Sequence, residues 1–377
     1  MIQHSQPIPS SVIMDIIKGR SDALPQETEI FTSILTVICM PAHSARLKWA
    51  VRWELILKAP SDKCCPRVVI HSKPFPINLN TMGVILHSMH SHFEFSKNGD
   101  LPEQPRQVLA LAEKSIQPFI KEGFPSDLHH LIVATSCPDM LAPSVGQMIN
   151  ERFNDHFSNC QTIDMVQGCA GGVSAMILGS QLSEYTKSSA LVIQVDAARK
   201  ATSRSKSIHK IFGNGSFGCL IKYDTNGKGL VHYKTRQHKG LSEVVTIKLG
   251  HDSDAIIQEK EDMRSDPRKH LGLSLNNSLA MKLIREAEGF YIEFVKESKA
   301  PDVMILHQVN PHIISHLRSL FDKYNLTFID VACLTGNCGA ASVGIALERA
   351  KDTIRGKKVL LCSFGTGGVI TAGLWQN

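Results

Sequence analysis

The chain has 377 residues, of which 43% are hydrophobic and 20% are charged. This composition is that of an ordinary globular protein, and it excludes a disordered chain and a small disulfide-rich domain. The net charge of +6 is too weak to indicate nucleic-acid binding, because the aromatic residues that would stack on bases make up only 6% and are scattered. We expect no nucleic-acid partner.

No segment has the features of a membrane span or a secretion signal. The longest apolar-leaning stretch, 30–40, is too short to cross a bilayer as a helix. The N-terminal segment 1–20 has no compact apolar run after a basic start. The ten cysteines follow no regular framework, which favours free thiols in a reducing compartment. We therefore expect a cytoplasmic protein without a membrane partner.

From about residue 102 onward, helical patterns alternate with short β-branched runs. The segment 107–123 has helix-like apolar spacing, although Pro118 interrupts it. Short apolar runs predict buried strands over 131–135, 190–195, 303–306 and 359–362. Strands that alternate with helices favour an α/β sheet covered on both faces. The first hundred residues are less regular, and 82–95 is compatible with either a helix or a strand.

The sequence contains a weak internal repeat. VQGCAGGVSAMILGSQL, from Val166, resembles LTGNCGAASVGIALERA, from Leu334, with Cys169 opposite Asn337. ALVIQVDAA resembles VLLCSFGTG, and LIVATSCP resembles VMILHQVNP. The three matches occur in the same order at similar spacing, which predicts two similar halves.

Cys169 is a candidate nucleophile. It lies in Gly-Cys-Ala-Gly-Gly, between an apolar segment and a run with the length of a buried helix, so we expect it at a strand-to-helix turn. Small residues permit a tight bend there. The helix N-terminus is expected to lower the pKa of the thiol, and its free N–H groups to stabilise an oxyanion. The alternative is a buried structural cysteine.

His307 and Asn337 occupy comparable positions. His307 follows the apolar run VMIL and opens HQVNP, and Asn337 lies in GNCGAAS before a small-residue helix. Either residue alone would be most simply structural. Together with Cys169 they make a Cys-His-Asn constellation plausible.

These motifs resemble the active-site motifs of β-ketoacyl-ACP synthase III and its relatives in the thiolase superfamily. The resemblance is carried by QGCAGG, FGNGSFGCLI, HQVN, GNCGAAS and SFGTGG, in that order over about 105–377. It implies a thiolase-like α/β fold in which two similar halves form a five-layered αβαβα sandwich. We expect residues 1–225 to form the half that carries the cysteine, and 226–377 the half that carries His307 and Asn337.

The resemblance also implies roles and a reaction. Cys169 would accept the acyl group of a thioester, and His307 and Asn337 would stabilise an enolate oxygen. The backbone N–H groups of Cys169 and Thr366 would form the oxyanion hole. The expected reaction is Claisen condensation of the acyl-cysteine with a malonyl- or β-ketoacyl-thioester, in fatty-acid-derived secondary metabolism such as polyketide or antibiotic formation. A non-decarboxylating acyltransferase and a subunit of a condensing heterocomplex remain alternatives.

Substrate carriers and partner chains follow from the same resemblance. We expect acyl-CoA or an acyl carrier protein as substrate, no separate cofactor, and a homodimer or a heterodimer with another ketosynthase-like subunit. Leu141 and Ala142 would cross to the partner and shape the acyl pocket. The basic stretch 199–210 is either a solvated loop or a docking surface for the carrier or CoA, through Arg199, Lys200, Arg204 and Lys206.

Two other motifs are set aside. Gly213, Gly215 and Gly218 match G-x-G-x-x-G, but a strand-like run follows where a dinucleotide site needs a helix. His87, His90 and His92 have no acidic or cysteine partner at ligand spacing, so we expect no metal site.

Overall fold

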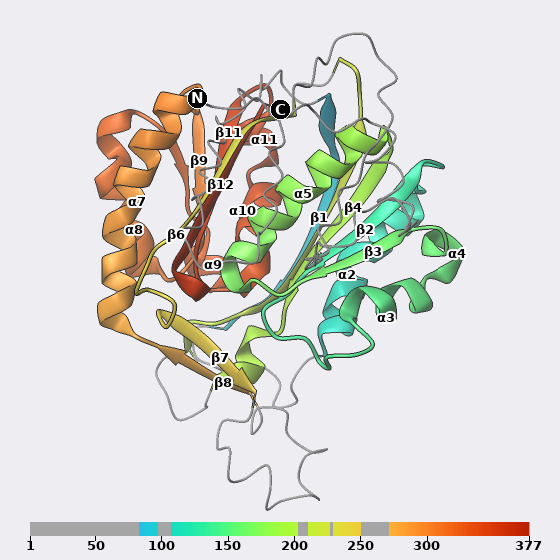
Figure 1. Ribbon diagram of the computed structural model, residues 1–377, viewed down its shortest axis with the longest axis horizontal. Coiled ribbons are helices and arrows are strands. Elements are labelled where there is room, and N and C mark those ends of the chain that lie inside the picture. Colours follow the sequence, from blue (N-terminus) through green and yellow to red (C-terminus); the bar gives the residue numbers. More distant parts are fainter. Residues whose placement is uncertain (1–82, 97–106, 203–209, 227–228, 250–270, 377) are drawn as a thin grey trace, which may run out of the picture. The chain divides into compact units, whose positions relative to one another are not determined.

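A computed structural model describes residues 83–96, 107–202, 210–226, 229–249 and 271–376 (Figure 1). All of them belong to one compact unit that extends from Ile77 to Asn377. They form two five-stranded sheets, a two-stranded sheet and the helices that pack on them.

The first sheet contains five strands in the order β1-β5-β4-β2-β3. Its strands are β1 (Val84–Glu94), β2 (Leu128–Ala134), β3 (Gln161–Met165), β4 (Ser189–Asp196) and β5 (Asn214–Tyr223). Strand β2 is parallel to β3 and β4, whereas β5 is antiparallel to β4 and β1. Within the segment that the sequence left open between helix and strand, Val84–Glu94 is therefore an edge strand.

The second sheet repeats this arrangement in the order β10-β9-β11-β12-β6. Its strands are β6 (Leu230–Gln237), β9 (Val303–Leu306), β10 (Thr327–Ile329), β11 (Lys358–Gly365) and β12 (Val369–Gln376). In both sheets the first strand is at one edge and the last one lies antiparallel beside it. The expected boundary at 225/226 falls between the two sheets.

The helices complete five layers, as the family resemblance implies (Figure 1). Helices α5 (Gly171–Thr186) and α10 (Ser342–Arg349) share the apolar core between the sheets. The outer layers are α2 (Val108–Glu122) with α3 (Val145–Arg152) on one side, and α7 (Asn277–Glu297) with α8 (Pro311–Phe321) on the other. Helix α2 continues through Pro118, which the sequence expected to interrupt it.

Close packing between the halves depends on small side chains in α5. A Cβ on Gly172 would lie 2.1 Å from the carbonyl oxygen of Ala340, so a larger residue has no room there. Ala340 belongs to a short 3-10 turn, η8 (Gly339–Ala341), that leads into α10. The start of α5 is thus pressed against the start of α10.

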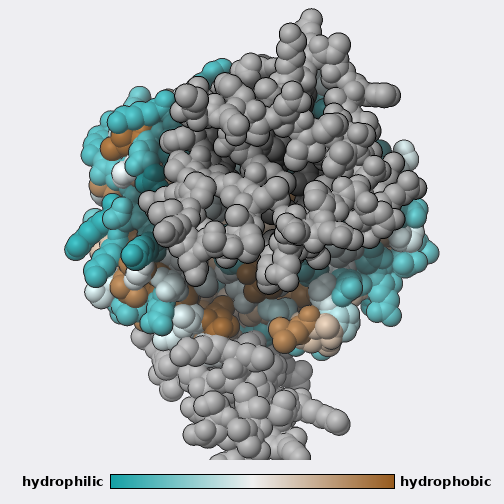
Figure 2. Space-filling view, in the orientation of Figure 1, coloured by the Kyte–Doolittle hydropathy of each residue, from teal (hydrophilic) through white to brown (hydrophobic). Residues whose placement is uncertain are grey.

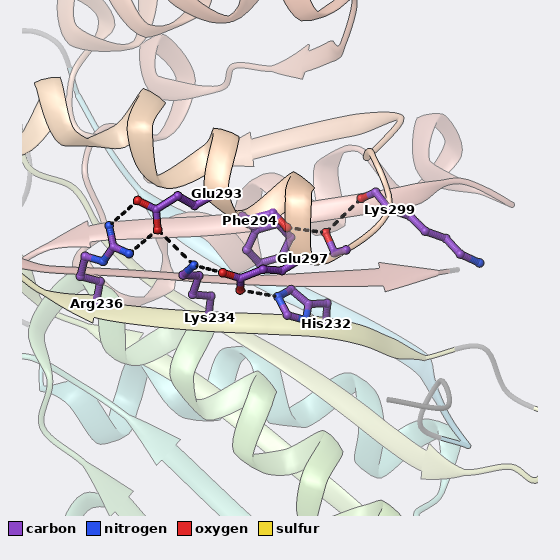
Figure 3. Close-up of polar contacts among 8 residues, drawn as sticks. His232, Lys234, Arg236, Glu293, Phe294, Glu297 and Lys299 are labelled. Carbon is purple, nitrogen blue, oxygen red and sulfur yellow. Dashed lines mark hydrogen bonds and ion pairs between the residues drawn. The ribbon is translucent and has the colours of Figure 1, made fainter. Parts of the chain in front are cut away.

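Helix α7 is fastened to the second sheet by a row of charges (Figure 3). Alternate residues of the edge strand β6, His232, Lys234 and Arg236, face Glu293 and Glu297 of α7. Lys234 Nζ lies 3.2 Å from Glu293 and 2.5 Å from Glu297, and Arg236 holds Glu293 through two nitrogens. These ion pairs fix the helix that forms one wall of the cavity described below.

The remaining elements are short. Strands β7 (Val245–Leu249) and β8 (Leu271–Leu275) pair antiparallel, and α4 (Asn154–Phe157), α9 (Ala332–Thr335) and α11 (Lys351–Ile354) are single turns. The strands predicted from 131, 190, 303 and 359 are confirmed as β2, β4, β9 and β11. Within the described ranges, no helix combines the length and apolarity that a membrane crossing requires.

Candidate active site

Cys169 lies where the chain leaves β3 and enters α5. A 3-10 turn, η2 (Gly168–Ala170), leads directly into the helix, so the thiol stands at the N-terminal end of 16 helical residues. Gly168 has a φ of 58°, a conformation that favours glycine. Ser363 Oγ, from β11 of the other half, donates a hydrogen bond of 2.7 Å to the Cys169 carbonyl oxygen. The backbone around the thiol is therefore fixed by both halves.

The sequence predicted a lowered pKa for this thiol, and that prediction is wrong: the pKa is raised. Burial, followed by the negative charge of Asp196, raises the pKa of Cys169 to about 12. The backbone N–H of Cys169 and the hydroxyl of Thr366 act in the opposite direction and have smaller effects. At neutral pH the resting side chain is consequently a neutral thiol, and the thiolate has to form during the reaction.

His307 follows β9 directly and has a buried imidazole. Its backbone N–H donates to the carbonyl oxygen of Cys362, and its ring packs edge-on against Phe364 with the centroids 6.0 Å apart. Burial lowers the pKa of His307 to about 4. The ring is therefore neutral at physiological pH, where it offers one N–H donor and carries no charge to pair with the thiolate.

Asn337 is held by the chain segment that precedes β5. Its N–H donates to the Ile211 carbonyl oxygen at 2.9 Å, and its own carbonyl oxygen accepts from the Gly213 N–H at 3.0 Å. The side-chain oxygen Oδ1 accepts from the Gly339 N–H at 2.9 Å. Because the loop occupies Oδ1, the Nδ2 group is the part of the amide that is available to a ligand.

The three candidate residues line a single cavity of about 250 Å³. The sequence separates them widely, and the packing of the two halves brings them together. Most of the other lining side chains are apolar and come from β7, β8, α7, the start of α8 and the end of β11: Val245, Ile247, Leu273, Leu275, Ala280, Met281, Leu283, Ile284, Ile313 and Phe364. The cavity thus combines a few polar groups with a wall suited to an alkyl chain.

Asp196, at the end of β4, is a functional candidate that the sequence did not reveal. It is fully buried, and its carboxylate accepts hydrogen bonds from Ser136 N–H and from Ala340 N–H, each at 2.6 Å. Thr135 Oγ1 donates to it at 3.0 Å, and Ser136 Oγ donates as well. The carboxylate therefore ties the loop after β2 to the turn after Asn337. A single aspartate after an apolar run gives no sign of these contacts.

Comparison with known proteins agrees with this architecture. Residues 297–377 match the family model for the C-terminal part of 3-oxoacyl-[acyl-carrier-protein (ACP)] synthase III. The β-ketoacyl-[acyl-carrier-protein] synthase III of Clostridium tetani is 26% identical over 256 residues, which cover 64% of this chain and 75% of the relative. The enzyme of the same name from Neisseria gonorrhoeae is 26% identical over 293 residues, covering 74% and 83%.

Solved structures show the same fold. A crystal structure of 3-oxoacyl-(acyl-carrier-protein) synthase III superposes with a TM-score of 0.67 at 16% identity, covering 78% of this chain and 99% of the other. The chain is thus similar in sequence to β-ketoacyl-ACP synthase III enzymes and has the fold of their solved structures. OleA of Xanthomonas campestris, solved with bound lauric acid and lauroyl-CoA, has the same fold, with a TM-score of 0.60 at 16% identity and coverage of 79% and 100%.

The start of the basic stretch is buried, contrary to both sequence expectations for it. Arg199 and Lys200 are only 7% and 3% exposed, so they form neither a solvated loop nor an open docking surface. Lys200 Nζ pairs with Asp139 Oδ1 at 2.7 Å, and Asp139 Oδ2 accepts from the Val108 N–H at the start of α2. Arg204 and Lys206 lie outside the described residues.

Leu141 and Ala142 do not line the cavity within one chain. Leu141 is 80% exposed, and both residues belong to the loop between β2 and α3. Val166, directly after the edge strand β3, is 67% exposed. Figure 2 shows further hydrophobic side chains at the lower part of one face, between hydrophilic margins. No group of three or more potential metal ligands occurs among the residues that the structure describes.

Proposed function

We propose that this protein takes an acyl group from a CoA or acyl carrier protein thioester onto Cys169 and joins it to a malonyl- or β-ketoacyl-thioester. The observation that carries the proposal is the shared cavity: Cys169, His307 and Asn337 meet in an apolar pocket although they come from three distant segments. A nucleophile and two neutral donors facing one apolar space are what an acyl transfer followed by carbon–carbon bond formation requires.

In the first half-reaction, the Cys169 sulfur attacks the thioester carbonyl and a new carbon–sulfur bond forms. The backbone N–H groups of Cys169 and Thr366 would stabilise the oxyanion. The carbon–sulfur bond to the first carrier then breaks, and the carrier leaves as a thiol with the proton that Cys169 gave up. The thioester that remains on the enzyme has no charge to stabilise.

In the second half-reaction, a malonyl thioester loses carbon dioxide and the released electron pair forms an enolate. Neutral His307 would donate its N–H, and Asn337 its Nδ2–H, to the enolate oxygen. The enolate carbon attacks the acyl carbonyl, the carbon–sulfur bond breaks, and Cys169 leaves as a thiolate that takes a proton from solvent to restore the resting thiol. Because burial keeps His307 uncharged, the ring would offer the enolate a hydrogen bond. A charged ring could instead transfer its proton to the enolate before the carbon–carbon bond forms. A β-ketoacyl thioester would reach the enolate by loss of a proton.

The wall of the cavity favours a primer with an alkyl chain over acetyl. Side chains from β7, β8 and α7 surround the space next to Cys169 with hydrocarbon. Burial of each methylene group contributes roughly 0.8 kcal/mol, so a longer chain gains binding energy that acetyl cannot. OleA, which shares the fold, has been solved with lauroyl-CoA. We infer a place in the synthesis of fatty-acid-derived secondary metabolites.

A second copy of the chain would complete the pocket. Leu141 and Val166 are large apolar side chains that are exposed beside an edge strand, where an unpaired strand edge is available to another chain. On this proposal, Leu141 and Ala142 enter the partner's acyl pocket, and the small Ala142 leaves room for the chain. A homodimer is the expected assembly.

Intact-protein mass spectrometry tests the proposal. The enzyme is incubated with acyl-CoA thioesters from acetyl to dodecanoyl, and Cys169→Ala is compared with Cys137→Ala, which removes another cysteine of the same cavity. One acyl adduct that persists in Cys137→Ala and disappears in Cys169→Ala is expected. Addition of malonyl-CoA should then discharge the adduct with release of carbon dioxide. Discharge without carbon dioxide would indicate simple acyl transfer, and an adduct retained in Cys169→Ala would contradict the proposal.

A further inference from the structure

The hydroxyl of Thr366 is a polar group that the proposed reaction has not yet used. Thr366 opens the 3-10 turn η9 (Thr366–Gly368) directly after β11 and lines the same cavity as Cys169. Its Oγ1 is buried and has no hydrogen-bond partner within the described part of the chain. Buried hydroxyls nearly always find a partner, so an unpaired one in a cavity wall indicates a role toward what enters the cavity or lies beside it.

The backbone places this hydroxyl beside the nucleophile. A Cβ on Gly168, the residue before Cys169, would lie 2.1 Å from Thr366 Oγ1. A Cβ on Gly365, the residue before Thr366, would lie 3.5 Å from Cys169 Sγ. The two glycines therefore allow the chain segments 168–169 and 365–366 to lie in direct contact, with Oγ1 against the residue that precedes the thiol.

The surroundings of the sulfur leave few other groups to support a thiolate. Among the residues that the structure describes, the titratable groups that line the cavity are Cys137, Cys169 and His307. Asp196 does not line the cavity, but its charge acts on both cysteines. Asp196 opposes a negative charge on the sulfur, and His307 is neutral because its pKa is lowered by burial. The backbone N–H of Cys169 and, after it, the Thr366 hydroxyl lower the pKa of Cys169, so Thr366 is the side chain that favours the thiolate.

We propose that the Thr366 hydroxyl donates a hydrogen bond to the Cys169 sulfur as the thiolate forms, and thereby helps to activate the nucleophile. The proposal rests on Cys169 as the acyl acceptor. In the resting state the S–H group can donate to Oγ1, and when the proton leaves, the hydroxyl turns its own hydrogen toward the sulfur. No bond to Thr366 is made or broken. After acylation the sulfur is neutral, and the hydrogen bond weakens.

Three substitutions separate the hydroxyl from the shape of the side chain. Thr366→Val keeps the branched shape without the hydroxyl, Thr366→Ser keeps the hydroxyl, and Thr366→Ala removes both. The rate of Cys169 alkylation by iodoacetamide is measured from pH 6 to 10, with peptide mapping to follow Cys169 alone. A hydrogen bond to a charged group corresponds to about ten- to a hundredfold in equilibrium. Thr366→Val should therefore be alkylated at least about tenfold more slowly at pH 8, with its profile moved to higher pH, and Thr366→Ser should restore the wild-type profile.

Several outcomes overturn the proposal. Coincident alkylation profiles for wild type, Val and Ser would show that the hydroxyl does not act on the sulfur, and slow alkylation of Thr366→Ser would assign the effect to shape. If Thr366→Val does not fold, as judged by its thermal transition, Thr366→Ala against Thr366→Ser makes the same comparison. Alkylation requires no substrate, so this result is independent of acyl loading, whose loss in Cys169→Ala tests the proposed function separately.

Discussion

The carboxylate of Asp196 accepts a hydrogen bond of 2.6 Å from the backbone N–H of Ala340, a residue 144 positions away in the other half of the molecule. The same carboxylate accepts from the Ser136 N–H in its own half. Asn337 lies three residues before Ala340. The negative charge of Asp196 also contributes to the raised pKa of Cys169. One buried side chain is thus coupled to both the loop of the candidate donor and the candidate nucleophile.

Replacement of Asp196 should therefore affect both stability and the thiol. Asp196→Ala leaves several buried donors without an acceptor, and we expect a loss of roughly 3–5 kcal/mol in the free energy of unfolding, measured by chemical denaturation. Asp196→Asn keeps the volume and removes the charge, so alkylation of Cys169 should move to lower pH. Asp352, with a side chain 85% exposed, is the matched control, and its change to Ala should cost less than about 0.5 kcal/mol. Equal stability of Asp196→Ala and Asp352→Ala would contradict this assignment.

His307 and Asn337 should be required for condensation and not for acyl loading. In His307→Ala and Asn337→Ala we expect the acyl adduct to form on Cys169, while its discharge by malonyl-CoA slows by about a hundredfold or more, the usual cost of one lost oxyanion donor. Single-turnover kinetics with mass detection separates the two steps. Loss of adduct formation in both variants would instead place these residues in the first half-reaction.

The buried imidazole of His307 predicts a pH dependence of stability. The pKa of His307 is lowered from 6.5 to about 4 by burial, so the folded chain binds fewer protons here than the unfolded chain. The free energy of unfolding therefore keeps its full value above pH 6.5 as far as His307 is concerned. It falls by on the order of 3 kcal/mol as the pH decreases from 6.5 toward 4. The slope of the unfolding free energy in this range should be smaller in His307→Gln. Nitrogen NMR of the labelled ring should show it neutral at pH 6, and a charged ring there would refute the interpretation.

The ion pairs between β6 and α7 predict a second loss of stability, at lower pH than that from His307. Arg236 and then Lys234 lower the pKa of Glu293 to about 2. Because the folded pKa is below that of the unfolded chain, stability from Glu293 is present above about pH 4.5 and is lost as the pH falls toward 2. Glu293→Gln should lower the melting temperature slightly at pH 7, and the difference from wild type should narrow below pH 4.5. Asp352→Asn also removes one carboxylate charge, at a more exposed site without such a network, and should show no such narrowing.

Leu141 and Ala142 provide a test of the proposed dimer. Leu141→Asp should convert the dimer to a monomer, because a charge is then buried where an apolar side chain met the partner. Sedimentation velocity measures the change. Ala142→Phe should keep the dimer and move the preferred primer toward shorter chains in the adduct assay. A wild-type monomer, or a preference for acetyl in the wild type, would remove the basis for this assignment.

The parts of the site that sequence reasoning found are those that depend on local pattern. Cys169 stands among small residues before a helix, and His307 follows an apolar strand, so each position is visible from its neighbours. Periodicity predicted an α/β sheet and the repeat predicted two similar halves, whereas the five-layered arrangement was implied by the resemblance to β-ketoacyl-ACP synthase III. Asp196 and the hydroxyl of Thr366 were missed because their importance comes from contacts across the two halves, which no local window contains.

Two expectations failed because burial outweighs local chemistry. A basic stretch is usually solvated, but Lys200 is buried against Asp139, which lies 61 residues earlier in the chain. A helix N-terminus favours a thiolate, yet removal of Cys169 from water has the larger effect on its pKa. Neither the distant carboxylate nor the depth of the thiol can be deduced from residue types along the chain.

The matching order of strands in the two sheets has a consequence for how the chemistry is divided. Cys169 and Asn337 occupy corresponding turns: Cys169 lies between β3 and α5, and Asn337 lies between β10 and α10, each after the third strand of its sheet in chain order. Two identical halves would present the same residue twice and would offer either two thiols or two amides. Joining the halves in one chain frees each turn to carry its own residue. The resulting asymmetry lets one cavity hold both the proposed nucleophile, Cys169, and a proposed enolate donor, Asn337.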